Sequence, residues 1–312
     1  MISVVLPTYN AATFLAEAIE SILQQTFQEF ELIIVDDGST DNTLEIINPY
    51  LGNPKVKVIK GEHKGLSCAL NLGIAEAQYP WIARMDADDI ALPDRFQRQV
   101  EASCLFPQVV AWGTYAFYIS ASGKKLGLAA SGPTSIEDFE DRRDEGHLVQ
   151  LIHPTVILKK ETLIAAGGYR TEFEPVEDLD LFNRMTGYGP VLAIPEPLLQ
   201  YRIHNQSVSM KRFFFQRVLM RYIITSHRRS LANLPSQTFD EFRDDYNHIF
   251  WLARLDRGLK TYGMFFYRKA GLSVGDGSYL YGGVYLALSI LCNPGYSLSR
   301  FVRQVLPTKT KK

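Results

Sequence analysis

Three aspartates, Asp86, Asp88 and Asp89, follow directly on an apolar run in the stretch YPWIARMDADDIALP. Carboxylates this close together repel one another, so the arrangement adds no stability unless a positive charge lies among them. Carboxylate oxygens are ligands that suit Mg²⁺ or Mn²⁺, and Mg²⁺ usually combines one or two carboxylates with substrate phosphates. The three aspartates therefore predict a divalent cation site that acts on a phosphorylated substrate. As the alternative, they cap the following helix, which fits Asp89 best.

A second group of acids, Glu177, Asp178 and Asp180, lies in the stretch VEDLDLFNRM. This stretch has helical spacing, which places Glu177 and Leu181 on one face and Asp178 about 100° away from Glu177. A carboxylate here can act as the general base that takes a proton from a hydroxyl group. The alternative is a solvated helix start, where acids are favoured by the helix dipole.

The elements that must position these acids come from an alternation of strands and helices. Strands are predicted at ISVVLP, FELIIVD, VKVIKG and YPWIARM, and a helix follows each of them, the last at LPDRFQRQVEASCLF. Such an alternation predicts a parallel sheet with right-handed crossovers, in which ligands bind at the carboxyl ends of the strands. Polar residues follow the first strand (Thr8 to Asn10), the second (Asp37) and the fourth (the three aspartates). We therefore expect them at one edge, where Tyr9 can stack on a nucleobase and Asp37 can accept from a pyrimidine N–H. Asn10 can instead cap a helix.

The chain changes character along its length. After Pro107 we expect a strand at VVAWGTYAFYIS, a strand with a short helix at HPTVILKKETLIAAGGY, and two short strands in VLAIPEPLLQYRIHNQSVS. From about residue 209 the sequence predicts only helices. Of the 33 Lys and Arg residues, 17 lie from Ser209 onward with 6 acids, which leaves 16 basic and 28 acidic residues before them. An acidic first part and a basic second part predict two regions with different partners.

Composition excludes several classes of protein. The 312 residues are 46% hydrophobic and 21% charged, which is typical of a globular protein of one large domain or two. The three cysteines are far apart, so zinc ribbons and thioredoxin motifs are excluded, and a reducing compartment such as the cytoplasm is favoured. No apolar run reaches 18 residues. PTYNAAT, after the first strand, lacks the glycines expected of a sugar nucleotidyltransferase or a dinucleotide-dependent oxidoreductase.

Taken together, the motifs VVLPTYN, FELIIVDDGSTDNT, GLSCALNLGIAEA, IARMDADDI and VEDLDLFNRM resemble the family 2 glycosyltransferases of GT-A fold. The resemblance implies an α/β fold over residues 1–208, with a mainly parallel sheet flanked by helices, and leaves 209–312 as a basic helical C-terminal region. It implies an inverting, metal-dependent transfer of a sugar from a nucleotide diphosphate sugar, a UDP-sugar above all, to an acceptor hydroxyl in cell-surface polysaccharide or glycolipid synthesis. The alternative is a non-catalytic sugar-nucleotide-binding or scaffold protein of this fold, although both acidic motifs are present.

The resemblance also implies roles for individual residues. Pro7, Thr8, Tyr9 and Asp37 match the nucleobase pocket, with Asn10 beside it. Asp86 and Asp88 match the DxD pair that holds the ribose and a Mn²⁺ or Mg²⁺ ion, and Asp89 matches an acid at the same edge. Asp178 in the ED motif is our candidate base, with Glu177 and Asp180 as rivals. Three further residues are expected to reach the metal or the donor: His204 and Arg202 in YRIHNQSVS, and Lys64. Arg202 can also pair with the acids.

The basic C-terminal region interleaves arginines with aromatic residues, as in KRFFFQRVLMRY and GMFFYRKA. No nucleic-acid-binding module is present in the sequence, so we expect no nucleic acid partner. Arginine, lysine and aromatic residues at helical spacing are typical of helices that lie on a membrane surface. We therefore expect peripheral contact with an anionic membrane at its cytoplasmic face, where a saccharide or lipid-linked saccharide is the acceptor. The alternatives are a helical packing element and a homodimer surface.

Overall fold

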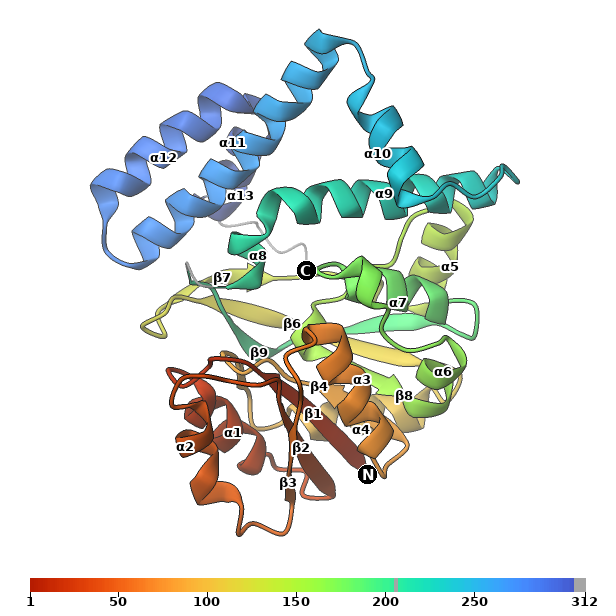
Figure 1. Ribbon diagram of the computed structural model, residues 1–312, viewed down its shortest axis with the longest axis vertical. Coiled ribbons are helices and arrows are strands. Elements are labelled where there is room, and N and C mark those ends of the chain that lie inside the picture. The colour runs from red at the N-terminus through yellow and green to blue at the C-terminus, as the bar shows by residue number, and fades with distance from the viewer. Residues whose placement is uncertain (205–206, 306–312) are drawn as a thin grey trace, which may run out of the picture. The chain divides into compact units, whose positions relative to one another are not determined.

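The computed structural model describes residues 1–204 and 207–305 (Figure 1). The chain divides into two compact units. The first unit comprises Met1–Tyr118 and Leu128–Arg202, and the second comprises Ile119–Gly127 and the chain from Ile203 onward. The acidic motifs DADD and EDLDL both belong to the first unit.

The first unit is built on a mixed sheet with helices on both faces. Its strands are β1 (Ile2–Thr8), β2 (Phe30–Asp36), β3 (Val56–Lys60), β4 (Trp81–Arg84), β5 (Ile90–Ala91), β6 (Ala111–Ile119), β7 (Lys125–Ala129), β8 (Ile157–Lys159) and β9 (Val191–Arg202), the tips of β6 and β7 extending into the second unit. Its helices are α1 (Leu15–Leu23), α2 (Thr43–Ile47), α3 (Leu66–Glu76), α4 (Arg95–Leu105), α5 (Ile136–Asp144), α6 (Lys160–Ala165) and α7 (Glu177–Met185), with 3₁₀ turns η1 (Asn48–Tyr50), η2 (His153–Thr155) and η3 (Thr171–Phe173).

Strand order in the sheet is β3-β2-β1-β4-β8-β6-β9-β5, with β7 paired to β6. The four neighbouring strands β3, β2, β1 and β4 are parallel to one another, as the alternation of strands and helices predicted. The pairs β4–β8, β8–β6 and β9–β5 are antiparallel, so the sheet is mixed. Figure 1 shows α1 and α2 on one side of the parallel strands and α3 on the other, as right-handed crossovers require when the strand order reverses at β1.

The prediction of two short strands between Val191 and Ser209 was wrong. One strand of twelve residues, β9, runs from Val191 to Arg202 through Pro195 and Pro197. A proline removes only its own N–H donor, so a strand continues through it where that donor is not needed for pairing. β9 thereby delivers Arg202 to the loop that carries the three aspartates.

The parallel half of the sheet is the core that fixes the strand ends. All seven residues of β1 are buried, as expected of a central strand covered on both faces. α1 buries Leu15, Ala18, Ile19 and Ile22, which share one face at helical spacing. α3 approaches the sheet so closely that a Cβ at Gly73 would lie 2.5 Å from Val5 Cγ1 and 3.1 Å from Val35 Cγ2. The carboxyl ends of β1, β2 and β4 are therefore held in place by dense packing beneath them.

The second unit is helical apart from the tip of the β6–β7 hairpin. Its helices are α8 (Val208–Lys211), α9 (Phe213–Leu231), α10 (Phe239–Asn247), α11 (Trp251–Gly275), α12 (Tyr279–Cys292) and α13 (Pro294–Val305). α11 and α12 pack side by side (Figure 1): Gly282 lies against Val274, and the Ser289 hydroxyl donates to the carbonyl of Gly263 at 2.7 Å. Within residues 1–204 and 207–305, none of the helices combines the length and the hydropathy needed to cross a bilayer.

Replacing Gly73 tests how tightly α3 packs on the sheet. We expect Gly73→Ala to lower the free energy of unfolding of the first unit by about 1–3 kcal/mol, because the added methyl group overpacks the contact with Val5. Gly52→Ala is the matched control, since a Cβ there meets no atom within 4 Å. Urea unfolding followed by tryptophan fluorescence is the measurement, and equal stability of the two variants would contradict the close approach.

Candidate active site

The three aspartates lie on the turn between β4 and β5. Each offers a carboxylate oxygen, and these oxygens all lie within 4.8 Å of one another. Burial raises the pKa of Asp86 and Asp89, and the charge of Asp88 raises both further. Oδ2 of Asp89 is buried and has no hydrogen-bond donor in the part of the chain that the structure describes. Close hard oxygen ligands, repelling charges and an unsatisfied buried oxygen together fit a divalent cation.

A positive charge that the protein itself places beside these acids is Arg84, the last residue of β4. Its side chain is only 4% exposed, and one of its terminal nitrogens contacts Oδ2 of Asp86. Burial by itself would lower the pKa of Arg84, but the charge of Asp86 and its hydrogen bond outweigh burial and raise it. Arg84 therefore stays charged. Sequence reasoning did not single it out, although an arginine at the end of an apolar strand run was a visible signal.

A second arginine, Arg202 at the end of β9, holds the same turn from the other side. Its backbone N–H donates to Oδ1 of Asp89 at 2.7 Å, and its Nε donates to the backbone carbonyl of Asp88 at 2.7 Å. Its guanidinium contacts the carboxylate of Glu17 and lies 4.4 Å from the ring centre of Phe14. The guanidinium thus pairs with the acid Glu17, and contact of Arg202 with the donor stays a prediction.

The residues predicted to bind the nucleobase gather after β1 and β2. Pro7 and Thr8 are buried in β1, and the Tyr9 ring, 44% exposed, stacks on His63 with ring centres 4.2 Å apart and planes at 27°. The carboxylate of Asp37 accepts the backbone N–H groups of Lys64 and Gly65 at 3.0 and 2.8 Å. Sequence reasoning missed His63, because nothing in the local pattern connects it with Tyr9.

Asn10 and Lys64 differ in how firmly they are held. The interpretation of Asn10 as a helix cap was wrong, because α1 begins only at Leu15. Asn10 has a positive φ of 48°, and its side-chain oxygen accepts the backbone N–H of Thr40 at 2.8 Å, which ties the loop after β1 to the loop after β2. The Lys64 ammonium lies 2.6 Å from Glu62, and both side chains are exposed.

The acids of the ED motif have three different environments. Glu177 is 3% exposed, and burial together with the charge of Asp178 raises its pKa to about 8. Asp178 is half-buried and accepts the backbone N–H of Leu179 at 2.8 Å, and burial raises its pKa to about 6. The carboxylate of Asp180 pairs with Arg184 at 2.6 Å and with Arg170 at 3.7 Å. Asp180 therefore holds the start of α7 in place, whereas Asp178 is suited to exchange a proton near neutral pH.

The two acidic motifs belong to one electrostatic cluster. The charge of Arg84 lowers the pKa of Glu177 and Asp178, and the charge of Asp86 raises that of Asp178. Two further buried polar residues that sequence reasoning left without a role, His153 and Tyr169, belong to the same cluster. His204 lies in the second unit, so its part as a metal ligand stays a prediction, and Asn205 and Gln206 of the same loop lie outside the described residues.

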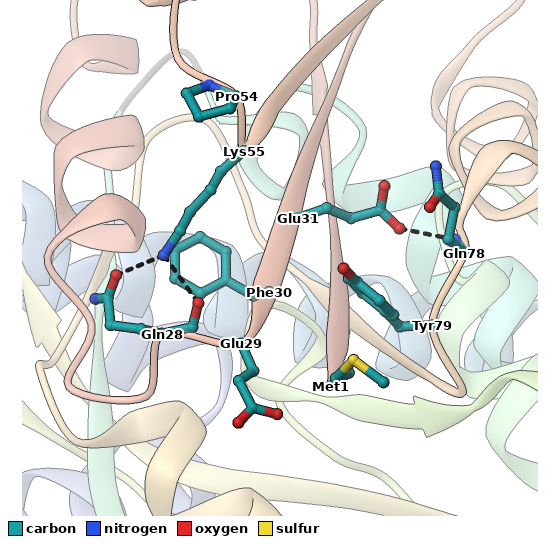
Figure 2. A pocket seen from close by; sticks show the side chains of 9 residues that line it. All are labelled: Met1, Gln28, Glu29, Phe30, Glu31, Pro54, Lys55, Gln78 and Tyr79. Carbon is teal, nitrogen blue, oxygen red and sulfur yellow. Dashed lines mark hydrogen bonds between the residues drawn. The ribbon is translucent and has the colours of Figure 1, made fainter.

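A cavity of about 400 Å³ lies elsewhere in the first unit (Figure 2). Its lining includes Met1, which precedes β1, and Phe30, which opens β2, so it is at the amino ends of the strands. Lys55 closes one side of it by donating to the Gln28 carbonyl at 2.8 Å. None of the predicted site residues lines this cavity.

Comparison with known proteins agrees with this geometry. The family described as Glycosyl transferase family 2 matches residues 3–162. The amylovoran biosynthesis glycosyltransferase AmsE of Erwinia amylovora is 30% identical over 218 residues, which cover 68% of this chain and 80% of that protein.

Two solved structures share the fold at low sequence identity. TarS of S. aureus, residues 1–349 in complex with UDP-GlcNAc, has a TM-score of 0.58 at 16% identity, covering 97% of this chain and 88% of that one. The mannosyltransferase PcManGT of Pyrobaculum calidifontis, in complex with GDP-Man and Mn²⁺, has a TM-score of 0.53 at 16% identity, covering 96% and 78%. The chain thus has the GT-A fold expected from the sequence, and it belongs to glycosyl transferase family 2.

Proposed function

We propose that this glycosyltransferase is a metal-dependent inverting enzyme that moves a sugar from a nucleotide diphosphate sugar to an acceptor hydroxyl. The donor is a UDP-sugar, and the acceptor is a saccharide or lipid-linked saccharide in cell-surface polysaccharide or glycolipid synthesis. One observation carries the proposal: the aspartate cluster and the half-buried Asp178 share one electrostatic environment around Arg84. A site suited to a metal-bound diphosphate and a carboxylate suited to act as general base thereby lie in one cluster.

Asp178 acts as the base in this proposal. It takes the proton of the acceptor hydroxyl while that oxygen attacks the anomeric carbon from the side opposite the leaving diphosphate, so the configuration inverts. Glu177, whose pKa of about 8 keeps it largely protonated near neutral pH, leaves the negative charge of the pair on Asp178. A base positioned in this way contributes about 10²–10⁴-fold to the rate.

Asp88 and Asp89, with Asp86 beside them and His204 as a further ligand, would hold Mn²⁺ or Mg²⁺. When bound, the cation supplies positive charge that stabilises the leaving diphosphate. The base and ribose of the donor would bind at Pro7, Thr8, Tyr9, Asn10, Asp37 and Asp86, with Lys64 and Arg202 near the phosphates. The complexes of TarS with UDP-GlcNAc and of PcManGT with GDP-Man and Mn²⁺ support a nucleotide sugar and a divalent cation. Thermal shift with a panel of nucleotide sugars and Mn²⁺ tests the choice of donor.

We also propose that the second unit contacts an anionic membrane at the cytoplasmic face. α12 contains no charged residue, yet Leu280 and Leu291 are each 79% exposed. α11 exposes Trp251, Leu255 and Tyr262, along with Arg254 and Lys260. Exposed apolar and aromatic side chains beside basic ones are typical of surfaces that insert among lipid headgroups.

The metal site predicts cooperative binding of cation and donor. Because the protein offers few ligands, Mn²⁺ should bind weakly to the free enzyme and more tightly once UDP supplies phosphate oxygens. Asp88→Ala should remove most of the Mn²⁺-dependent binding of UDP while the fold survives. Asp141→Ala, an exposed acid on α5, is the control. Calorimetry with and without UDP is the measurement, and equal Mn²⁺ affinity in both would refute the shared site.

Asp178→Asn should lower kcat by about 10²–10⁴-fold and leave UDP affinity near that of the unmodified enzyme. With the pKa of Asp178 raised to about 6, transfer should fall as the pH drops through about 6, where the base becomes protonated. Because the raised pKa means that folding disfavours the charged form, Asn should cost no stability at neutral pH. Asp180→Asn should affect kcat far less. If Glu177→Gln is the crippling substitution instead, the base is one position earlier.

Membrane contact predicts flotation with liposomes that contain anionic lipid. Basic residues near such a surface contribute roughly 1 kcal/mol each, and salt screens that attraction, so binding should weaken at high salt. Leu280→Ser combined with Leu291→Ser should reduce flotation without changing UDP binding. Leu105→Ser, at a 74% exposed position of the first unit, is the control. Absence of flotation at low salt would overturn the membrane contact, and a dimer in size-exclusion chromatography would then assign the surface to a second copy.

A further inference from the structure

His153, the first residue of η2, is a buried histidine for which the proposed reaction has no use. Its side chain is 10% exposed. Nε2 lies 2.9 Å from the hydroxyl of Tyr169, and Nδ1 lies 3.7 Å from Oε1 of Glu177. The ring also packs against Phe182, with ring centres 6.0 Å apart in an edge-to-face arrangement. Both polar atoms of the imidazole therefore face groups that belong to the candidate active site.

The protonation of this group follows from its surroundings. Burial, and then the charge of Arg84, lowers the pKa of His153 well below its usual range, so the ring is neutral. Burial raises the pKa of Tyr169, so its hydroxyl keeps its proton. A neutral imidazole has one N–H and one lone pair. If Tyr169 donates to Nε2, the imidazole N–H is on Nδ1 and faces Oε1 of Glu177, at a distance longer than a hydrogen bond.

Glu177 is the buried acid beside this ring. It is 3% exposed, and its Oε2 has no hydrogen-bond donor among the described residues. The charged or titratable groups that act on it are His153 from η2, Arg84 from β4, and Glu174 and Asp178 from its own segment. The imidazole ring, whose Nδ1 lies 3.7 Å from Oε1, limits the orientations open to this side chain and to the first turn of α7.

Tyr169 is itself anchored. Its backbone N–H donates to Oδ1 of Asn71 at 2.9 Å, and its carbonyl accepts from Nδ2 of Asn71 at 2.7 Å. Asn71 lies on α3, which is packed on the parallel strands. A continuous set of contacts therefore leads from α3 through Tyr169 and His153 to Glu177.

We propose that His153 is a positioning residue of the transfer reaction: anchored by Tyr169, it fixes Glu177 and thereby the orientation of Asp178. The proposal rests on the role of Asp178 as base. Catalytic groups must be held close to their productive geometry, and a misplacement of about 1 Å costs up to 10²-fold in rate. His153 supplies that constraint without touching the substrates.

Three substitutions separate positioning from packing. We expect His153→Phe to fill the space but lower kcat by about 10- to 100-fold, while the Kd of UDP stays within about twofold. Asn places its amide near the position of Nδ1, and Gln places its amide near that of Nε2. His153→Asn should therefore restore more of kcat than His153→Gln does. Normal kcat in all three variants, or a loss that appears only in KM, would overturn the proposal.

A double-mutant cycle tests whether His153 acts through Glu177. We expect His153→Phe combined with Glu177→Ala to lower kcat no further than the more damaging single substitution, because both remove the contact between these two side chains. Additive losses would overturn the proposal. Asp178→Asn separates a failure of this proposal from a failure of the proposed base. Full activity of Asp178→Asn would refute Asp178 as the base. An inactive Asp178→Asn together with a fully active His153→Phe would refute only the role of His153.

Discussion

The ion pair between Arg84 and Asp86 is the interaction on which the candidate site depends. A carboxylate cluster at the end of a buried strand is costly, because desolvation and mutual repulsion both disfavour the charged forms. Arg84, nearly inaccessible to solvent, offsets that cost from within the protein. Its charge also acts on Glu177 and Asp178, so one guanidinium counters the acids of both motifs. Without it, the acids would have to be more exposed or less charged.

The mixed sheet explains how one arginine can serve both groups. The parallel half delivers the loops after β1, β2 and β4, and the antiparallel neighbour β8 is preceded by η2. The backbone N–H of Arg84 donates to the carbonyl of Val156, so β4 and the segment that carries His153 are directly joined. The carbonyl of Arg84 accepts from the buried side chain of Arg95 on α4, which keeps the end of β4 in place. The groups of the two acidic motifs thus share one framework.

Neighbouring acids also differ in their burial and in their partners. Glu177, Asp178 and Asp180 lie within four positions of one another, yet one is buried against His153, one is half-buried and one is paired with two arginines. Their pKa values and partners differ because each carboxylate meets different neighbouring groups. The same division holds at the other motif, where Asp86 faces Arg84 and Asp89 faces the backbone of Arg202. The surroundings of each side chain therefore decide which carboxylate is buried, which is half-buried and which is paired with arginine.

The sequence by itself determined the features that neighbouring residues encode. Apolar runs and helical spacing predicted β1 to β4 with the helices between them, the placement of DADD at a strand end, the position of α7 and the helical second unit. Only the tertiary structure decided that Asn10 ties two loops together, that β9 passes through two prolines, and that Arg84, His153 and Tyr169 surround the ED motif. It also decided that Asp180 pairs with two arginines, whereas the contacts that the structure describes for Asp178 include no arginine. The reason is physical: periodicity is a property of adjacent residues, whereas burial and pairing depend on groups such as Arg84, His153 and Glu177 that meet only when the chain is folded.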